Sequence, residues 1–209
     1  MAAAAVLMIG SVSGMACQSR TGAVLDDNFK APNPGWGAPE SDVAFTAQGL
    51  VLRPPANNSV FILNENYTLD AMDFCIDVAV PGNLPSPANQ DDSGDIGVLF
   101  WSRDAEDFYT ATISLDGSAA IDRLIKGEWQ IIYGPTPTAA VKTAAGATNQ
   151  VEIEITGNAG SLFINDAKIA DFHGQAPPKG GPPGLYAESG VTAVTTWVVP
   201  RVQLLPLAR

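Results

Sequence analysis

Four side chains with a large ring or a guanidinium group fall within a stretch of short apolar segments: Trp101, Arg123, Trp129 and Tyr133. The C–H faces of a sugar ring pack on Trp and Tyr, and sugar hydroxyls seek planar polar partners such as a guanidinium group. In an alternating strand, Phe100 and Trp101 point to opposite faces, so Trp101 is expected on the outer surface. The pattern predicts a ligand-binding patch with Trp101 as the sugar platform and Arg123 nearby. Burial of these rings in the core is the alternative.

The densest acidic run of the chain is Asn89-Gln-Asp-Asp-Ser-Gly-Asp95. Closely spaced carboxylate oxygens are ligands for Ca²⁺. Asp91, Asp92 and Asp95 are therefore the candidate metal ligands, and calcium is the one cofactor that the sequence suggests. The run lacks the distal Glu of a complete calcium loop, so a solvated turn is the alternative.

No set of residues matches a catalytic signature. Glycoside hydrolysis needs a pair of carboxylates, and Glu152 and Glu154 share one face of an alternating strand. They match half of the laminarinase-type Glu-x-Asp-x-x-Glu signature, but Thr156 and Gly157 stand where the general acid would follow. His173 is the single histidine, and the chain has no Gly-x-Ser-x-Gly nucleophile elbow. We therefore assign no catalytic residue and interpret both glutamates as a solvated face.

Short extended segments must position these residues. The 20 glycines and 16 prolines favour many turns, and no helical period extends over a full window. Pro200 divides the last of the expected segments. The expected strands are Leu50–Arg53, Val60–Leu63, Phe74–Val80, Ile96–Ser102, Phe108–Leu115, Ser118–Arg123, Trp129–Tyr133, Val151–Thr156, Ser161–Asn165, Lys168–Phe172, Gly184–Ala187 and Thr196–Leu205.

Two dipeptides predict tight hairpins. Asp116-Gly117 is a preferred type I′ pair, and Asn165-Asp166 is a second tight-turn pair. The segment 151–155 alternates cleanly, with its valine and isoleucines expected to face a core. Strands joined by hairpins without crossover helices predict an all-β fold, an antiparallel two-sheet sandwich.

Several short motifs follow one another in a fixed order, beginning with Gly97-Val-Leu-Phe-Trp101, Asp107-Phe-Tyr109 and Asp116-Gly117. From Ile96 to Leu205 this order of features resembles the concanavalin A-like/laminin G-like jelly rolls of bacterial exported proteins. That superfamily includes the 3-keto-disaccharide hydrolase-like domain. The resemblance implies a jelly-roll sandwich, a fold that carries lectins, glycosidases and structural modules alike. Trp101 stands where the family usually has Arg or Lys. The segments that carry the resemblance are Gly97–Trp101, Asp107–Tyr109, Asp116–Gly117, Lys126–Trp129, Asn149–Ile153, Gly160–Lys168 and Gly184–Ala187.

The N-terminal segment has the pattern of an export leader. An uncharged apolar run, too short for a bilayer span, is followed by Gly14-Met15-Ala16, a small-x-small cleavage site before Cys17. The site also resembles a bacterial lipobox, in which Cys17 would be lipidated. If Cys17 is removed or acylated, Cys75 is a small buried hydrophobe. A disulfide between them is the alternative.

The pattern divides the chain into three parts. Residues 1–16 are expected to be a signal peptide or lipoprotein leader, 17–24 a tether, and 25–209 a single β-sandwich domain. The expected location is extracytoplasmic: periplasmic, lipid-anchored or secreted.

The balance of charges limits the partners. Eleven Lys and Arg against 22 Asp and Glu give a net charge of −11, which repels nucleic acid and anionic membrane surfaces. The membrane is expected as a partner only through a lipid anchor at Cys17. A glycan or a surface protein is the expected partner.

Three functions are compatible with these patterns. The favoured one is a non-catalytic recognition module outside the cytoplasm, binding carbohydrate or a cell-surface partner. The resemblance implies the second, a glycoside or 3-keto-disaccharide hydrolase. The third is a structural scaffold domain without a small-molecule ligand.

Overall fold

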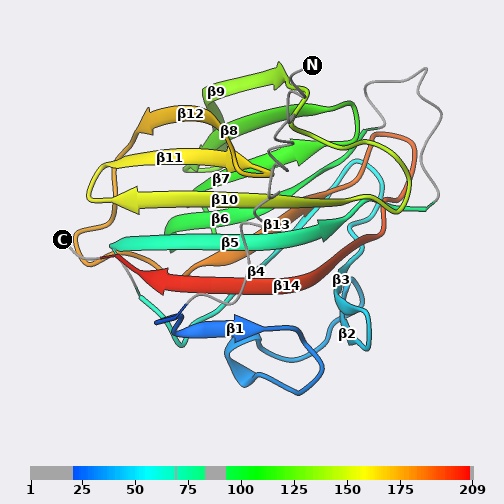
Figure 1. Cartoon of the computed structure of the whole chain (residues 1–209), viewed down its shortest axis with the longest axis horizontal. Coiled ribbons are helices and arrows are strands. Elements are labelled where there is room, and N and C mark those ends of the chain that lie inside the picture. Colours follow the sequence, from blue (N-terminus) through cyan, green and yellow to red (C-terminus); the bar gives the residue numbers. More distant parts are fainter. Residues whose placement is uncertain (1–20, 69, 83–92, 208–209) are drawn as a thin grey trace, which may run out of the picture.

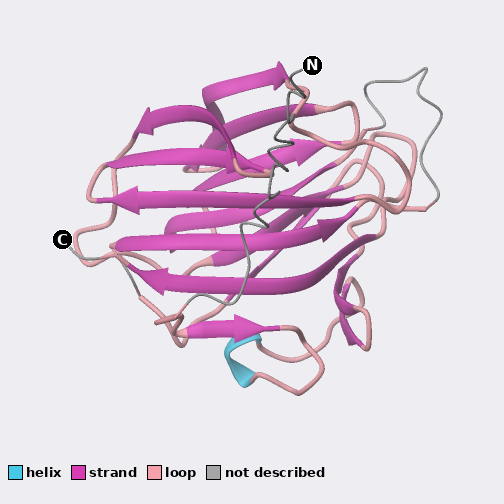
Figure 2. Cartoon of the chain, viewed as in Figure 1, coloured by secondary structure: helices cyan, strands magenta, loops and turns pink. Residues whose placement is uncertain are grey.

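Two antiparallel β-sheets pack face to face (Figure 1). The computed structural model describes residues 21–68, 70–82 and 93–207. Strands and their connecting loops account for nearly all of this part of the chain, and one short 3-10 helix, η1 (Pro34–Trp36), stands out in Figure 2. The predicted all-β, two-sheet jelly-roll sandwich is confirmed.

The larger sheet, sheet A, contains strands from both ends of the described chain. Its β1 (Leu25–Asp27) pairs with β14 at the side of the main order. The hydrogen-bonded order is β12 (Ala167–His173), β11 (Ala159–Ile164), β10 (Thr148–Thr156), β5 (Ala71–Ala79), β14 (Trp197–Pro206), β3 (Gly49–Leu52) and β2 (Val43–Thr46).

The smaller sheet, sheet B, is formed mainly by consecutive hairpins. Two strands from elsewhere in the sequence join it at one side. The order is β4 (Ser59–Leu63), β13 (Gly184–Glu188), β6 (Asp95–Asp104), β7 (Asp107–Ser114), β8 (Ser118–Ile125) and β9 (Glu128–Pro137).

Alternating side chains build the core between the sheets. On β10, Val151, Ile153 and Ile155 are buried at 0–1% exposure, as their alternation predicts. Each such side chain contributes about 1.5–3 kcal/mol when removed from water. The opposing residues from sheet B are Ile96, Val98, Phe100, Tyr109, Ala111 and Ile113.

The two predicted hairpins are present, with different turns. Asn165 and Asp166 have φ of 50° and 67°, the left-handed pair that a two-residue type I′ hairpin requires. The other hairpin is a longer connection, in which Gly117 alone is left-handed, with φ of 90°. The Asp116 carboxylate accepts a 2.8 Å hydrogen bond from the Ser118 backbone N–H and holds this turn closed.

A β-bulge interrupts the pairing of β6 with β7 after Phe100. Trp101 takes a left-handed conformation with φ of 48°. This irregularity puts Trp101 on the same side as Phe100, and the two ring centroids are 5.2 Å apart. Alternation therefore fails at the position where we expected it to expose a tryptophan.

The two sequence features tied to the N-terminus have different outcomes. Cys75 is buried, as expected, but it is disulfide-bonded, so the alternative of a disulfide holds and the expectation of a free thiol is wrong. Cys17 and the whole predicted leader lie outside the described residues. In the described part of the chain, no helix has the length and apolar character to span a membrane.

Candidate functional site

The outer face of sheet B carries an aromatic cluster. Phe108 lies at its centre, with its ring centroid 5.3 Å from Phe61, 5.8 Å from Trp129 and 6.5 Å from Tyr186. Trp129 and Tyr186 meet edge to face at 5.7 Å. Trp129 is 48% exposed, so the cluster holds one indole in a fixed orientation at the surface.

Beside this cluster lie two adjoining cavities of about 250 and about 200 Å³, which we call the acidic groove. They share Asp95 and Thr112 as lining residues. The first is lined by Asp95, Thr110, Thr112, Asp122, Trp129, Tyr186 and Glu188. The second is lined by Ser93, Asp95, Thr112, Ser114, Asp116, Ser118, Ala120 and Pro135.

Strand register explains how distant residues meet here. Tyr186 of β13 pairs with Gly97 of β6, and Gly97 pairs with Thr112 of β7. In the next step along the sheet, Thr110 of β7 pairs with Asp122 of β8. Four strands thus present alternate residues to one outer surface, while the residues between them enter the core.

Two carboxylates of the groove, those of Asp95 and Asp122, are destabilised as anions. Burial, and then the charge of Glu188, raise the pKa of Asp95 to about 7 from the 3.8 of a solvated aspartate. Burial and Glu188 also raise the pKa of Asp122 to about 6. Both groups therefore exchange a proton in the range where many enzymes and receptors work.

Tyr186 joins the aromatic and acidic parts of the site. Its hydroxyl donates a 2.9 Å hydrogen bond to the Glu188 carboxylate. Burial and the neighbouring Glu188 raise the pKa of Tyr186 well above its usual range, so the phenol stays protonated. The pair leaves one Glu188 oxygen available to a ligand in the cavity.

The expected outward orientation of Trp101 is wrong. Its side chain is 1% exposed and lies in the core, 5.1 Å from Tyr109 and 5.7 Å from Phe172 between ring centroids. The bulge that follows Phe100 turns it inward. A sugar cannot stack on a ring that is covered on both faces.

Arg123 is also buried, at 5% exposure. Its guanidinium forms an ion pair of 3.2 Å with Asp107, donates a 3.1 Å hydrogen bond to the Gln175 side chain, and lies 5.1 Å from the Tyr109 ring centroid. These contacts fix Arg123 at the inner side of sheet B, so it is not close to the exposed ring of Trp129.

The two predicted aromatics of β9 lie on different faces. Trp129 pairs with Leu124 and points outward into the acidic groove. A register shift beside Ile121 changes the alternation, and Tyr133, which pairs with Ile121, packs half-buried against the core. Of the four predicted ligand-binding residues, Trp129 alone contributes to the groove, and its binding role stays a prediction.

Of the three predicted calcium ligands, the structure describes one, Asp95. Asp91 and Asp92 lie outside the described residues. Asp95 lines both cavities of the acidic groove, and Asp122 and Glu188 line one of these cavities with it.

A separate acidic cluster lies on the outer face of sheet A. Carboxylate oxygens of Asp73, Glu152 and Glu154 lie within 4.8 Å of one another, close enough for one cation. Glu154 is exposed, as predicted, but Glu152 is 5% exposed, so the expectation that both glutamates are solvated is wrong for Glu152.

Sequence reasoning missed Asp122, Tyr186 and Glu188. Asp122 carried a signal, because a carboxylate in the middle of the apolar segment 118–125 needs a partner or a function. Glu188 and Tyr186 carried none, since their strand reaches the groove only through pairing with β6, whose residues lie far away in the sequence.

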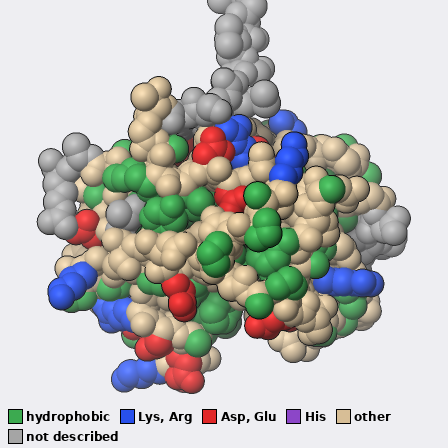
Figure 3. Space-filling view, turned by 90° about the horizontal axis from the view of Figure 1, so that it is seen from below, with side chains coloured by type: hydrophobic (Ala, Val, Ile, Leu, Met, Phe, Trp, Pro, Cys, Tyr) green, Lys and Arg blue, Asp and Glu red, His purple; other side chains and the backbone are tan. Residues whose placement is uncertain are grey.

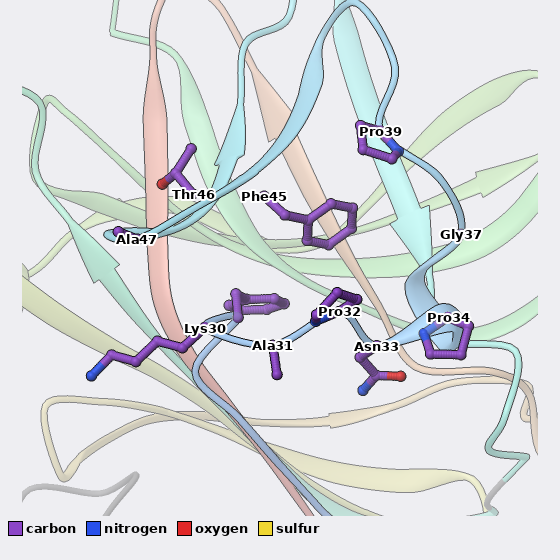
Figure 4. Close-up of a pocket in the computed structure, with 11 residues that line it drawn as sticks. Lys30, Ala31, Pro32, Asn33, Pro34, Gly37, Pro39, Phe45, Thr46 and Ala47 are labelled. Atoms are coloured by element: carbon purple, nitrogen blue, oxygen red, sulfur yellow. The ribbon is translucent and has the colours of Figure 1, made fainter.

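A larger hollow lies elsewhere, between η1 and β2, and measures about 670 Å³. Its lining is mostly apolar, with Phe29 and Phe45 at 6.2 Å between ring centroids. Hydrophobic side chains gather on this lower face of the molecule in Figure 3. In the close-up of Figure 4, Phe45 and Pro32 point toward each other while Lys30 points away. This hollow lacks the carboxylates that make the acidic groove chemically distinctive.

Comparisons with known proteins identify the fold. The chain matches no protein-family model and no curated protein. It is similar to the carbohydrate-binding module CBM66 from Bacillus subtilis, with 17% identity and a TM-score of 0.60 over 78% of this chain and 90% of that one. It is similar to Bacillus licheniformis β-glucanase, with 10% identity and a TM-score of 0.57 over 90% of this chain and 100% of the other. The chain is also similar to a glycosidic hydrolase, with 8% identity and a TM-score of 0.62 over 88% of this chain and 96% of that one. Identities this low establish the shared sandwich alone.

Proposed function

We propose that this protein is a carbohydrate-recognition module that binds a glycan in the acidic groove of sheet B. The observation that carries the proposal is Trp129, a half-exposed indole held edge-on by Phe108 and Tyr186 at the wall of a cavity. An indole face packs against sugar C–H groups, and the adjacent carboxylates and threonine hydroxyls accept or donate hydrogen bonds to sugar hydroxyls.

Two further observations support this proposal. The groove is small enough, at about 250 Å³ beside the indole, to hold about one sugar ring, and the second cavity continues it for the next unit. Solved structures named as a carbohydrate-binding module and a β-glucanase share the sandwich. We also propose, from the leader pattern, that the module works outside the cytoplasm, in the periplasm or secreted. We do not extend this proposal to a lipid anchor at Cys17, because Cys75 is disulfide-bonded and Cys17 is the only other cysteine of the sequence.

Tryptophan fluorescence gives a direct test. The chain has four tryptophans, and the three others, Trp36, Trp101 and Trp197, are each 1% exposed. A glycan that stacks on Trp129 therefore changes the emission of one accessible indole. A glycan array identifies ligands, and titration of the hits against the fluorescence measures their affinity.

Variants separate stacking from general damage. Trp129→Ala should lose at least about tenfold in affinity, equivalent to about 1.4 kcal/mol, with little change in melting temperature because the ring is half exposed. Trp129→Phe should retain part of the affinity. Phe163→Ala removes an aromatic from the outer face of sheet A and should bind as the wild type does. Unchanged glycan binding by Trp129→Ala would refute the proposed site, and binding of no glycan would favour a scaffold role.

Hydrolysis is a second candidate function because of one observation. A general acid works best with a pKa near the operating pH, and that of Asp95 is raised to about 7. If the groove hydrolyses the glycan it binds, chromatography of the bound oligosaccharide will show shorter products. Asp95→Asn would then lose about 10²–10⁴-fold in rate, whereas an intact oligosaccharide after prolonged incubation would leave recognition as the function.

A further inference from the structure

The lining of the acidic groove is unusual in its charge. Four carboxylates face the two cavities, from Asp95, Asp116, Asp122 and Glu188. Among the residues that the structure describes, none that lines either cavity is Lys, Arg or His. The remaining polar groups are hydroxyls and one indole N–H. A ligand in this groove therefore meets negative charge without any positive charge from the protein.

The ion pairs among the described residues lie outside the acidic groove. Within residues 21–68, 70–82 and 93–207, the ion pairs join Arg103 and Arg123 to Asp107, Lys168 to Asp171, and Arg201 to Asp26. None of these pairs includes a carboxylate of the groove. The groove acids thus lack the internal counter-charge that partly buried carboxylates usually have.

The raised pKa values of Asp95 and Asp122 agree with the lack of positive charge near these carboxylates. Burial is the first cause that raises the pKa of Asp95 and Asp122, and the charge of Glu188 is the second. Asp116 and Asp122 add to the effect on Asp95, and the hydrogen bond from Ser114 opposes it. A bound cation would stabilise every one of these anions at once.

The aromatic wall indicates which kind of cation fits. A hard metal ion seeks oxygen ligands and gains nothing from an exposed indole. An ammonium group on an organic ring is stabilised by both the carboxylates and the aromatic rings. The carboxylates attract its charge, and the faces of Trp129 and Tyr186 attract cations within about 6 Å. The sugar ring that carries the amine stacks on the same indole.

We propose that the acidic groove selects a glycan unit that carries a protonated amine, as a 2-amino sugar without an acetyl group does. This inference rests on the proposed glycan-binding function and names its ligand class. The net charge of −11 adds to the selection, because the field of the whole chain attracts cationic oligosaccharides and repels uronic or sulfated ones.

Three tetrasaccharides of equal length test the inference near neutral pH: a glucosamine tetramer, its fully N-acetylated form and cellotetraose. Titration against tryptophan fluorescence and by calorimetry should give the glucosamine tetramer at least about tenfold tighter binding than the other two. The preference should shrink when NaCl is raised from about 0.05 to about 0.5 M, because salt screens charge attraction.

Charge variants locate the effect. Asp122→Asn and Glu188→Gln should each lower the affinity for the glucosamine tetramer about fivefold or more and leave the neutral tetramers within about twofold. In Glu188→Gln the amide oxygen can still accept the Tyr186 hydrogen bond. Glu106→Gln removes one exposed charge in the turn between β6 and β7 and should change none of the affinities.

The outcomes distinguish this inference from the proposed function. If all three tetramers bind alike and Trp129→Ala weakens all of them, glycan recognition stands and amine selection is overturned. If none binds, both are overturned. If CaCl₂ alone binds to the groove with loss in Glu188→Gln, and no tetramer binds, the groove is a metal site and both are overturned.

Discussion

Asp95→Asn is expected to stabilise this protein at alkaline pH and to leave its stability unchanged at acidic pH. Asp95 begins β6, pairs with Ser114 across the sheet, and lies where the two cavities of the acidic groove meet. Asparagine has nearly the same shape and no charge. The substitution therefore replaces an ionisable group by a permanent equivalent of its protonated form.

The sign of the effect follows from the raised pKa. Between about pH 4 and about pH 7 the folded chain holds a proton on Asp95 that the unfolded chain has released. The stability of the wild type therefore falls as the pH rises through this window and is lowest above it. Asp122 acts in the same direction up to about pH 6. Asp95→Asn removes the larger of the two contributions.

The magnitude follows from the same values. A pKa of about 7 against 3.8 corresponds to an upper limit of about 4 kcal/mol, at about 1.4 kcal/mol for each unit of pKa. Because the groove admits solvent to one side of Asp95, we expect about half of this, or about 2 kcal/mol, at pH 8. At pH 4 both proteins should unfold with the same free energy.

Urea unfolding followed by the emission of the buried tryptophans measures this difference at several pH values. Glu106→Gln, an exposed charge removal on the same sheet, should show no difference at any pH. A variant Asp95→Asn that is less stable than the wild type at pH 8, or a difference in stability that does not change with pH, would refute the assignment of Asp95 as a partly buried acid with a raised pKa.

Three more predictions follow from the same structure. Trp101→Ala should lower the free energy of unfolding by about 3–5 kcal/mol, since it removes a large buried ring; a near-native urea curve would contradict its burial. The double variant of Glu152→Gln and Glu154→Gln should bind glycan with an affinity within about threefold of the wild type, because both residues lie on sheet A. A larger loss of affinity would indicate that the glycan binds on sheet A. Intact mass of protein from an expressing bacterium should correspond to a chain that begins at or near Cys17, and retention of Met1 in cytoplasmic protein would contradict export.

Local patterns sufficed to predict most of the sandwich. The alternation of 151–155, the Asn165-Asp166 turn and the spacing of the hairpins each depend on neighbouring residues, and each is confirmed. The short strands β1 and β2 were missed, because three or four residues without clear alternation carry little periodic signal.

The functional site could not be predicted in the same way. The prediction that Trp101 faces outward depended on strict alternation, and the β-bulge after Phe100 interrupts that alternation. The position of Tyr133 failed for a similar reason, a register shift beside Ile121. The acidic groove unites Asp122 with Glu188 through the pairing order of sheet B, which no local pattern records.

The place of β14 in sheet A has a consequence for synthesis on the ribosome. β5 lies between β10 and β14 and is paired on both sides, and β14 also pairs with β1 and β3. At about 5–20 residues per second, the roughly 120 residues between Ala79 and Trp197 take on the order of ten seconds to make. During that time the nascent chain exposes β1, β3 and one edge of β5 without their partner. We expect a chaperone to bind these edges during synthesis, because unpaired apolar strands promote aggregation.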